Sequence, residues 1–362
     1  MRERERGRQW LLLALGALAI ISTGAGPSSR ASGPTPPTIN SAAKQRGVCW
    51  VAGPGHVTVA DFKPLVTAHV TWISQTPFGW QPAADKPELF FRSKGGWWGE
   101  SDEGLAATTK LALADGIHTM LSPHLWLRHG REGKWRSDIA MTSAADWKRW
   151  FANYEAFILH YARFAERHEI GYLVIGTELA GTLPGHEGEW RHLIELVRAV
   201  YHGRLTYAAN WYQEADAVPF WDALDATGIQ AYFPLSDHPD PTLAELEAAW
   251  RKRLPGLATL ARRYDKPILF TEIGYRSTPD AAIDPWRWPA FSDQTKVRAD
   301  DALQARCYQA FFDVVWPEPW FGGAYFWKWY PTPPHHPQRL AIGFTPQGKP
   351  ALEILRQGFA PR

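Results

Sequence analysis

The chain has 362 residues, enough for one large domain or two ordinary ones, and its formal net charge is only +2. This charge is too small to indicate a nucleic-acid partner or binding to an anionic membrane surface. The 20 tryptophans are the most informative feature of the composition, because exposed indole faces can stack on sugar rings while others pack in the core.

The first 46 residues have the composition of a targeting segment followed by a linker. Arginines at positions 2, 4, 6 and 8 precede a short apolar run at residues 10–21 and then four small residues. That order is typical of a secretory signal peptide over residues 1–26, with an uncleaved N-terminal anchor as the alternative, although the run is short for a membrane span. Residues 27–46 are rich in Ser and Pro and are predicted to be a disordered linker. We therefore expect export, to the periplasm or outside the cell, with no stable membrane insertion after processing.

Residues 47–362 alternate between strand-like and helix-like stretches, with no further domain boundary. Apolar runs predict strands at residues 47–51, 70–74, 117–122, 171–179, 205–211, 228–233, 266–275 and 323–329. Capping residues and periodicity predict helices at residues 59–66, 101–115, 143–164, 187–201, 219–224, 242–264 with a break at Pro255, 296–315 and 351–357. Residues 75–100 are predicted to be a long loop.

This order of elements predicts an α/β fold, a (β/α)8 TIM barrel that forms a single domain. Alternating strands and helices indicate a parallel sheet, and eight such units indicate a closed barrel. The connections from helix to strand are short, whereas those from strand to helix are long and rich in Trp, Gly, Pro and His. The functional site is therefore expected at the C-terminal ends of the strands.

Two of the predicted strands end in the same way. Thr177-Glu178 closes the run at residues 171–179, and Thr271-Glu272 closes the run at residues 266–275. Either glutamate alone could be an ordinary strand-end residue that is solvated or salt-bridged. Two of them in matched contexts on one barrel rim indicate the paired carboxylates of glycoside hydrolysis.

Other motifs indicate no metal and no cofactor. His335-His336 has no acidic or cysteine partner at metal-ligand spacing. The Gly pairs at residues 95–96 and 322–323 lack the residues of a phosphate-binding loop, and Gly-x-Ser-x-Gly does not occur. Cys49 and Cys307 are expected to be small buried apolar groups, and a bond between them is left open.

The strand ends resemble those of glycoside hydrolase clan A, the retaining barrel enzymes. More narrowly, they are similar to glycoside hydrolase family 113, whose characterised members are mainly β-mannanases. The stretches that carry this resemblance are Gly176-Thr177-Glu178-Leu179, Phe270-Thr271-Glu272-Ile273-Gly274-Tyr275, Ser122-Pro123-His124, Ala209-Asn210-Trp211, Ala231-Tyr232-Phe233-Pro234 and Phe326-Trp327-Lys328-Trp329. Most clan A families place Asn directly before the acid/base glutamate; this chain has Thr177 there, as the narrower family also lacks that Asn.

The resemblance implies a double-displacement mechanism. Glu272 is expected to be the nucleophile, held ionised by hydrogen-bond donors that include Tyr232. Glu178 is expected to be the general acid and then base, protonated in the free enzyme because of its ionised neighbour and its limited solvation. A retaining pair would have its carboxyl groups about 5–5.5 Å apart, and an inverting pair about 6.5–9.5 Å.

Substrate-binding roles are predicted for six further residues: His124, Asn210, Trp211, Tyr232, Trp327 and Trp329. His124 could instead be a capping or loop histidine, and Tyr232 a packed barrel residue. Trp327 is expected to form the floor of the sugar subsite, with Trp329 the less favoured of the two. Five tryptophans on rim loops could line further subsites or simply cover the loops: Trp80, Trp97, Trp98, Trp286 and Trp288.

We therefore expect residues 47–362 to be an exported retaining glycosidase acting on β-mannosidic linkages of the β-1,4-mannan type. Its expected partner is a polysaccharide or oligosaccharide substrate, with no nucleic acid, and the protein is expected to be a monomer. One alternative is the same mechanism on another β-glycan, since a barrel fold does not determine the substrate. The other is a catalytically inactive carbohydrate-binding protein on the same barrel.

Overall fold

The computed structural model describes residues 43–91, 96–128, 133–288, 294, 296–331 and 337–361, all of which belong to one compact unit, Pro36–Arg362. Residues 1–26 and nearly all of the predicted linker lie outside this part of the chain. Among the described residues, no helix is both long and apolar enough to cross a membrane.

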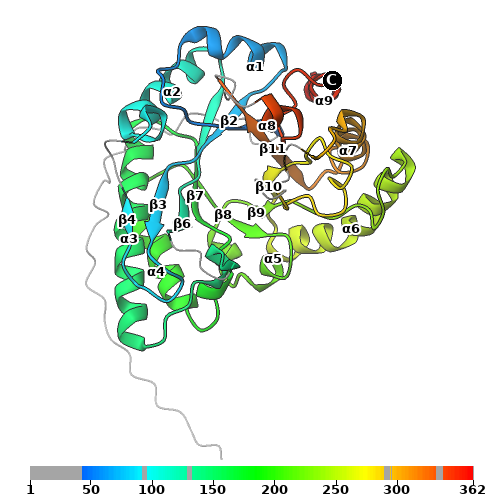
Figure 1. The fold of residues 1–362 in the computed structure, drawn as a ribbon. Coiled ribbons are helices and arrows are strands. Elements are labelled where there is room, and N and C mark those ends of the chain that lie inside the picture. The colour runs from blue at the N-terminus through cyan, green and yellow to red at the C-terminus, as the bar shows by residue number, and fades with distance from the viewer. Residues whose placement is uncertain are drawn as a thin grey trace, which may run out of the picture. The chain divides into compact units, whose positions relative to one another are not determined.

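Eight parallel strands close into a barrel, which confirms the predicted (β/α)8 fold (Figure 1). Around the barrel, each strand pairs with the next through a parallel register. In spatial order the strands are β1 (Gln45–Trp50), β2 (Trp72–Gln75), β5 (His118–Leu121), β7 (Tyr172–Thr177), β8 (Arg204–Asn210), β9 (Thr227–Gln230), β10 (Ile268–Ile273) and β11 (Phe321–Trp329).

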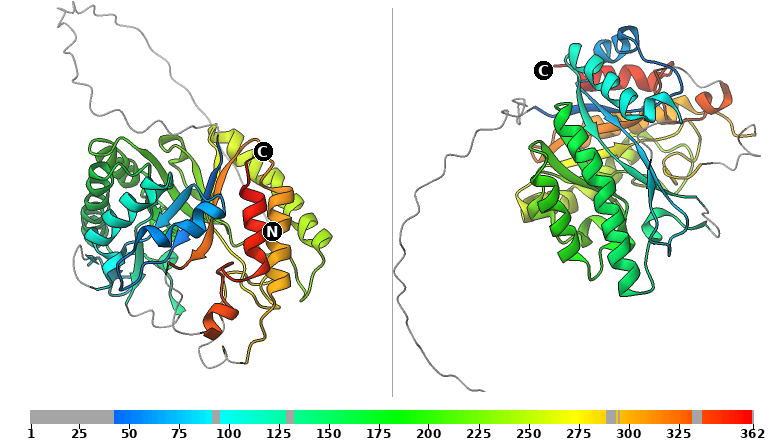
Figure 2. Two further views of the ribbon diagram at one scale, coloured as in Figure 1. Left: turned by 90° about the horizontal axis from the view of Figure 1, so that it is seen from above. Right: turned by 90° about the vertical axis from the view of Figure 1, so that its left-hand side faces the viewer.

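Helices surround the barrel, and the C-terminal helix packs beside α7 (Figure 2). Their bounds are α1 (Lys63–Thr67), α2 (Asp102–Ala114), α3 (Ala144–Arg167), α4 (Glu187–Arg198), α5 (Glu214–Ala217), α6 (Leu243–Tyr264), α7 (Asp301–Val314), α8 (Pro337–Ala341) and α9 (Pro350–Phe359). The predicted caps are present: the side chain of Ser101 accepts a hydrogen bond from the Gly104 amide, and that of Ser143 accepts one from the Asp146 amide. Each such cap stabilises its helix by about 1 kcal/mol.

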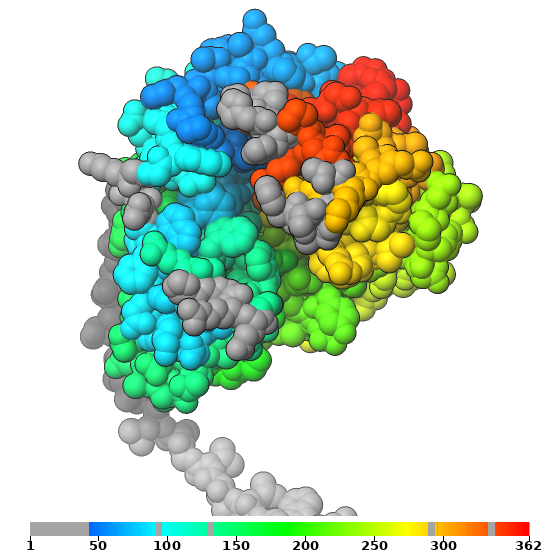
Figure 3. Space-filling model, in the orientation of Figure 1, coloured from blue at the N-terminus to red at the C-terminus, as the bar shows by residue number. Residues whose placement is uncertain are grey.

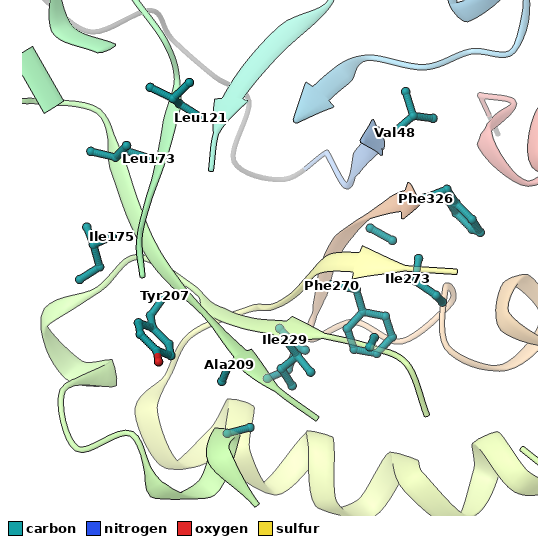
Figure 4. Packing of buried hydrophobic residues seen from close by; sticks show 14 of the residues in the cluster. Val48, Leu121, Leu173, Ile175, Tyr207, Ala209, Ile229, Phe270, Ile273 and Phe326 are labelled. Carbon is teal, nitrogen blue, oxygen red and sulfur yellow. The ribbon is translucent and has the colours of Figure 1, made fainter. Parts of the chain in front are cut away.

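Alternation along the strands produces two hydrophobic layers. Residues such as Met120, Val174 and Leu269 point into the barrel, where they pack with Cys49 and Tyr325. Their neighbours in sequence point outward, where they pack against the helices (Figure 4). Full burial of each large aliphatic side chain contributes about 1.5–3 kcal/mol. Cys49 and Cys307 are free and buried in these layers, as expected for apolar cysteines.

The region predicted to be a loop at residues 75–100 contains two strands. β3 (Phe78–Gln81) and β4 (Phe90–Phe91) join β6 (His124–Leu127) in a small sheet of order β4-β3-β6. Pro77 and Pro82 flank β3 and are themselves turn signals. The alternation of the strand is only four residues long, too short to predict a strand between them. Its parallel pairing with β6 joins the chain that follows β2 to the chain that follows β5.

The predicted break in α6 at Pro255 is wrong, because the helix runs through this residue. Pro255 is exposed, so the backbone carbonyl that its missing N–H leaves unpaired can bind water instead. Helix α7 begins at Asp301 rather than near residue 296. Asp300 caps it, because its side chain accepts a hydrogen bond from the Leu303 amide. The short helix α8 was not predicted.

Candidate active site

A cavity of about 900 Å³ opens at the C-terminal ends of the barrel strands, where the long connections lie. On the face of the molecule in Figure 3, early segments of the chain (blue to green) and late segments (yellow to red) meet side by side. Both predicted glutamates line the cavity, together with five of the six predicted substrate-binding residues: His124, Asn210, Trp211, Tyr232 and Trp327. The barrel thus brings side chains from six different strand ends to one site.

Trp329 does not line the cavity and is buried in the outer hydrophobic layer instead. The register between β1 and β11 shifts between Val48 and Trp50, so that Trp50 pairs with Trp329. This irregularity takes Trp329 off the face that Tyr325 and Trp327 share. The placement of Trp329 therefore contradicts the sequence-based expectation of a substrate-binding role.

Irregular backbone aims both glutamates into the cavity. The register of β7 against β8 shifts between Val174 and Thr177, and that of β10 against β9 shifts between Phe270 and Glu272. Such bulges re-aim side chains at the rims of barrels. Glu178 directly follows β7 with φ of 52°, in the left-handed region, which costs a non-glycine residue about 1–3 kcal/mol. Surrounding contacts must therefore hold Glu178 in place.

Glu178 is surrounded by hydrogen-bond donors and one cation. The indole Nε1 of Trp135 donates to Oε2 at 2.9 Å, and Nδ2 of Asn210 donates to Oε1 at 3.2 Å. Nε of Arg136 lies 3.8 Å from Oε2. Arg136 is 5% exposed, and its guanidinium lies over the rings of Trp126 and Trp135. These contacts fix the orientation of the Glu178 carboxyl.

Glu272 is more deeply enclosed. The hydroxyl of Tyr232 donates to Oε2 at 2.5 Å, and the side chain of Gln230 is a second donor. Burial raises the pKa of Glu272 to about 7, and the charge of Glu178 adds to this rise, while the two donors and Arg136 oppose it. The donors thus lower the pKa of Glu272, whereas burial raises it by more.

His124 lies on the other side of Glu272, with its Nε2 3.7 Å from Oε1. Burial lowers the pKa of His124 well below its usual range, and the charge of Arg136 lowers it further. The imidazole is therefore neutral at pH 7 and contributes no cation to the pair. Its Nε2 also lies 3.3 Å from Oγ of Ser122.

Indole rings make up much of the cavity wall. Of the rim tryptophans considered from the sequence, Trp97, Trp286 and Trp288 line the cavity, whereas Trp80 and Trp98 do not. The full set of lining indoles is Trp50, Trp97, Trp126, Trp135, Trp211, Trp286, Trp288 and Trp327. Such faces suit the apolar C–H patches of sugar rings.

Four cavity residues close to the glutamates were missed from the sequence: Trp135, Arg136, Gln230 and Lys328. Trp135 and Arg136 lie in the long connection between β6 and α3, where an arginine next to a tryptophan was the only local signal. Lys328 lies within the motif Phe326-Trp327-Lys328-Trp329, but the position of its side chain in the cavity depends on the backbone at the end of β11. Burial lowers the pKa of Lys328 to about 8, with Arg339 adding to the effect and Glu272 opposing it.

No group of three metal-ligating side chains occurs among the residues that the structure describes. His335-His336 lies outside this part of the chain.

A (β/α)8 barrel whose C-terminal cavity holds two carboxylates among indole rings defines a glycoside hydrolase. The model of Glycoside Hydrolase Family 113 matches residues 54–342 of the sequence. The chain therefore belongs to glycoside hydrolase family 113, which confirms the resemblance to this family and to clan A.

Solved structures agree with this assignment. The GH113 β-mannanase AaManA from Alicyclobacillus acidocaldarius, in complex with ManMIm, is 27% identical with a TM-score of 0.73, over 87% of this chain and 97% of that chain. A GH113 β-1,4-mannanase is 24% identical with a TM-score of 0.72, over 88% and 99% of the two chains. A β-glucuronidase from Ruminococcus gnavus shares the barrel fold at 12% identity and a TM-score of 0.57, over 88% of this chain and 50% of that chain. Comparison with curated protein sequences finds no match.

Proposed function

We propose that the protein is a retaining glycosidase that cleaves β-1,4-mannosidic linkages by double displacement, with Glu272 as nucleophile and Glu178 as general acid and base. The observation that carries the proposal is the presence of both carboxylates in one indole-lined cavity at the strand ends, and the roles of the two glutamates follow from the family resemblance of their strand ends. The similarity to the β-mannanase AaManA supports the mannan substrate.

In the first step a carboxylate oxygen of Glu272 attacks the anomeric carbon, and the bond to the leaving oxygen breaks as Glu178 gives that oxygen its proton. In the second step Glu178 removes a proton from water, whose oxygen displaces Glu272 and restores the starting configuration. The reactive state carries one proton on the pair, held by Glu178. Substrate must therefore bind to the form of the enzyme in which Glu178 holds this proton and Glu272 is ionised.

Neighbouring residues have separate tasks in this scheme. Tyr232 and Gln230 donate to Glu272 and thereby favour the ionised nucleophile. Asn210 and Trp135 orient the carboxyl of Glu178. Arg136 lies against Glu178, with its Nε 3.8 Å from Oε2, and supplies a positive charge beside this carboxyl. Trp327 and Trp211 offer ring faces to the sugars.

A panel of polysaccharides tests the substrate. Linear mannan, glucomannan, cellulose and xylan are incubated with the purified protein, and new reducing ends are measured. We expect release from mannan and glucomannan, and NMR of the first products should show the β-anomer because two inversions retain configuration. Faster cleavage of cellulose or xylan would overturn the mannan assignment. Tight glycan binding by titration calorimetry without product over hours would indicate an inactive binding protein.

Export is a separate part of the proposal and rests on residues 1–26, which have the layout of a signal peptide. Fractionation of cells that produce the full chain tests it. We expect the mature protein in the periplasm or the medium with an N-terminus near residue 27. Protein confined to the cytoplasm with its N-terminus intact would contradict export.

A further inference from the structure

A third buried carboxylate lies behind the acid/base candidate. Glu214, the first residue of α5, is 2% exposed. No ion pair to Glu214 is formed by the described residues within 4 Å, and its hydrogen bonds come from neutral donors: the hydroxyl of Tyr207 at 2.5 Å and the backbone amide of Asn210 at 2.7 Å. Burying a carboxylate without a cationic partner costs free energy, which indicates that Glu214 has a role that offsets this cost.

Both of its donors lead to Glu178. The hydroxyl of Tyr207, which donates to Glu214, accepts a hydrogen bond from the backbone amide of Leu179 at 2.8 Å. Leu179 is the residue directly after Glu178. The second donor is the backbone amide of Asn210, and the side-chain amide of the same residue donates to Glu178 at 3.2 Å. Glu214 is thus connected to the backbone beside Glu178 and to a donor on its carboxyl.

The packing around Tyr207 strengthens the first of these paths. A side chain on Gly176 would meet the ring of Tyr207 at 2.6 Å, so the ring lies directly against the end of β7. Tyr207 is fully buried on the outer face of the barrel (Figure 4), next to Trp190 and Phe220. A ring held this firmly can transmit the position of Glu214 to the backbone of β7.

Glu178 needs such support because its φ of 52° is strained. From these contacts we propose that Glu214 is a positioning residue for the general acid/base, acting through Tyr207 on the backbone at Leu179 and through Asn210 on the carboxyl of Glu178. This inference rests on the proposed function of Glu178. Glu214 does not touch the reacting atoms; it keeps the Glu178 carboxyl aimed at the leaving oxygen.

The test compares two substrates that differ in their need for an acid. Mannohexaose has a poor leaving group that must be protonated, whereas a 2,4-dinitrophenyl β-mannobioside has one that leaves without help. We measure kcat/KM, which reports the first displacement, for Tyr207→Phe and Glu214→Gln. For each variant we expect a loss of about 10- to 100-fold on mannohexaose and less than about threefold on the aryl substrate, since acid catalysis is worth about 10²–10⁴-fold.

Both rates come from one preparation, so a smaller folded fraction lowers them equally and cancels in their ratio. Tyr201→Phe is the matched control: this tyrosine is equally buried, and its hydroxyl donates to the carbonyl of Ile170 at 2.8 Å, before the start of β7. It should leave the ratio unchanged. The Y207F/E214Q double variant should lose little more than E214Q alone, because removal of Glu214 already interrupts the path through Tyr207.

Equal losses on the two substrates, or a loss below twofold on mannohexaose, would overturn the inference and leave the proposed function intact. A wild-type protein that cleaves neither substrate would instead overturn the proposed mannan activity, and the inference with it. The two failures are therefore distinguished before any variant is made.

Discussion

At the scale of single residues, Glu178 and Glu272 have almost the same sequence context but different neighbours. Glu178 has an indole donor, an amide donor and a guanidinium nearby, whereas Glu272 has a phenol, an amide and a neutral imidazole. Unequal surroundings are what separate the roles of an acid and a nucleophile in a carboxylate pair.

Removal of either carboxylate should have a distinct effect. Glu272→Ala should lower mannan turnover by at least about 10⁴-fold, because the covalent step is lost, and azide should restore part of it with inverted product.

Glu178→Ala should lower kcat/KM far more for mannohexaose than for an aryl mannoside. Turnover by reducing-sugar assay and product configuration by NMR check both. A Glu272→Ala variant with near-normal activity would remove Glu272 as nucleophile.

Loss of the phenol beside Glu272 should raise the pKa of that carboxyl further. The hydroxyl of Tyr232 donates to Glu272 at 2.5 Å and opposes the effect of burial. In Tyr232→Phe the ionised form loses a charge-assisted hydrogen bond worth about 1.5–3 kcal/mol. We expect kcat to fall by about 10- to 100-fold and the acidic limb of the kcat/KM profile to move to higher pH. An unmoved limb would show that Tyr232 does not act on this carboxyl.

At the scale of elements, two glycines have opposite packing. A Cβ on Gly228, in β9, would lie 2.2 Å from the backbone oxygen of Tyr207. A Cβ on Gly256, in α6, would have no atom within 4 Å. Gly228 allows two strands of the barrel to approach closely because it has no side chain. Gly256 has no such task and only lowers the stability of its helix.

Alanine at the two positions should therefore change stability in opposite directions. Gly256→Ala should raise the free energy of unfolding by about 0.5–1 kcal/mol. Gly228→Ala should lower it by more than about 3 kcal/mol, because backbone must move. Urea denaturation followed by tryptophan fluorescence measures both. A Gly228→Ala protein as stable as the wild type would contradict the close approach of β8 and β9 at Gly228.

At the scale of the whole molecule, buried carboxylates connect the active site to stability. Burial raises the pKa of Glu272 and of Glu214 to about 7, against the opposing hydrogen bonds of Tyr232 and Tyr207. In the unfolded chain a glutamate has a pKa of about 4.3. Between pH of about 4.3 and about 7 the folded protein binds protons that the unfolded chain does not. The contribution of these groups to the free energy of unfolding is therefore present at low pH and is lost as the pH rises toward about 7.

Glu272→Gln should remove part of this dependence. The variant should be more stable than the wild type at pH 8, by on the order of 3 kcal/mol, and the difference should shrink as the pH falls to 5. Thermal unfolding across this range measures it, and Glu353→Gln, on the surface of α9, is the control. A difference that does not vary with pH would mean that Glu272 titrates alike in the folded and unfolded states.

Much of the molecule follows from local patterns in the sequence. Eight apolar runs that alternate with capped helices are enough to predict a closed parallel barrel, because period and spacing are properties of neighbouring residues. Runs ending in Thr-Glu place Glu178 and Glu272 at the same rim for the same reason. The motifs at the other strand ends located His124, Asn210 and Tyr232 near the glutamates.

Tertiary structure alone decided several other groups that meet those carboxylates. Trp135 and Arg136 reach Glu178 across more than 40 residues, and Glu214 acts behind Glu178 from a helix of four residues. Register shifts also moved Trp329 out of the cavity. Such contacts depend on the register of the strands and on how the loops fold over the rim. The desolvation of Glu272, and with it the pKa of this carboxyl, depends on the same features. Adjacent residues in the sequence determine neither the contacts nor the desolvation.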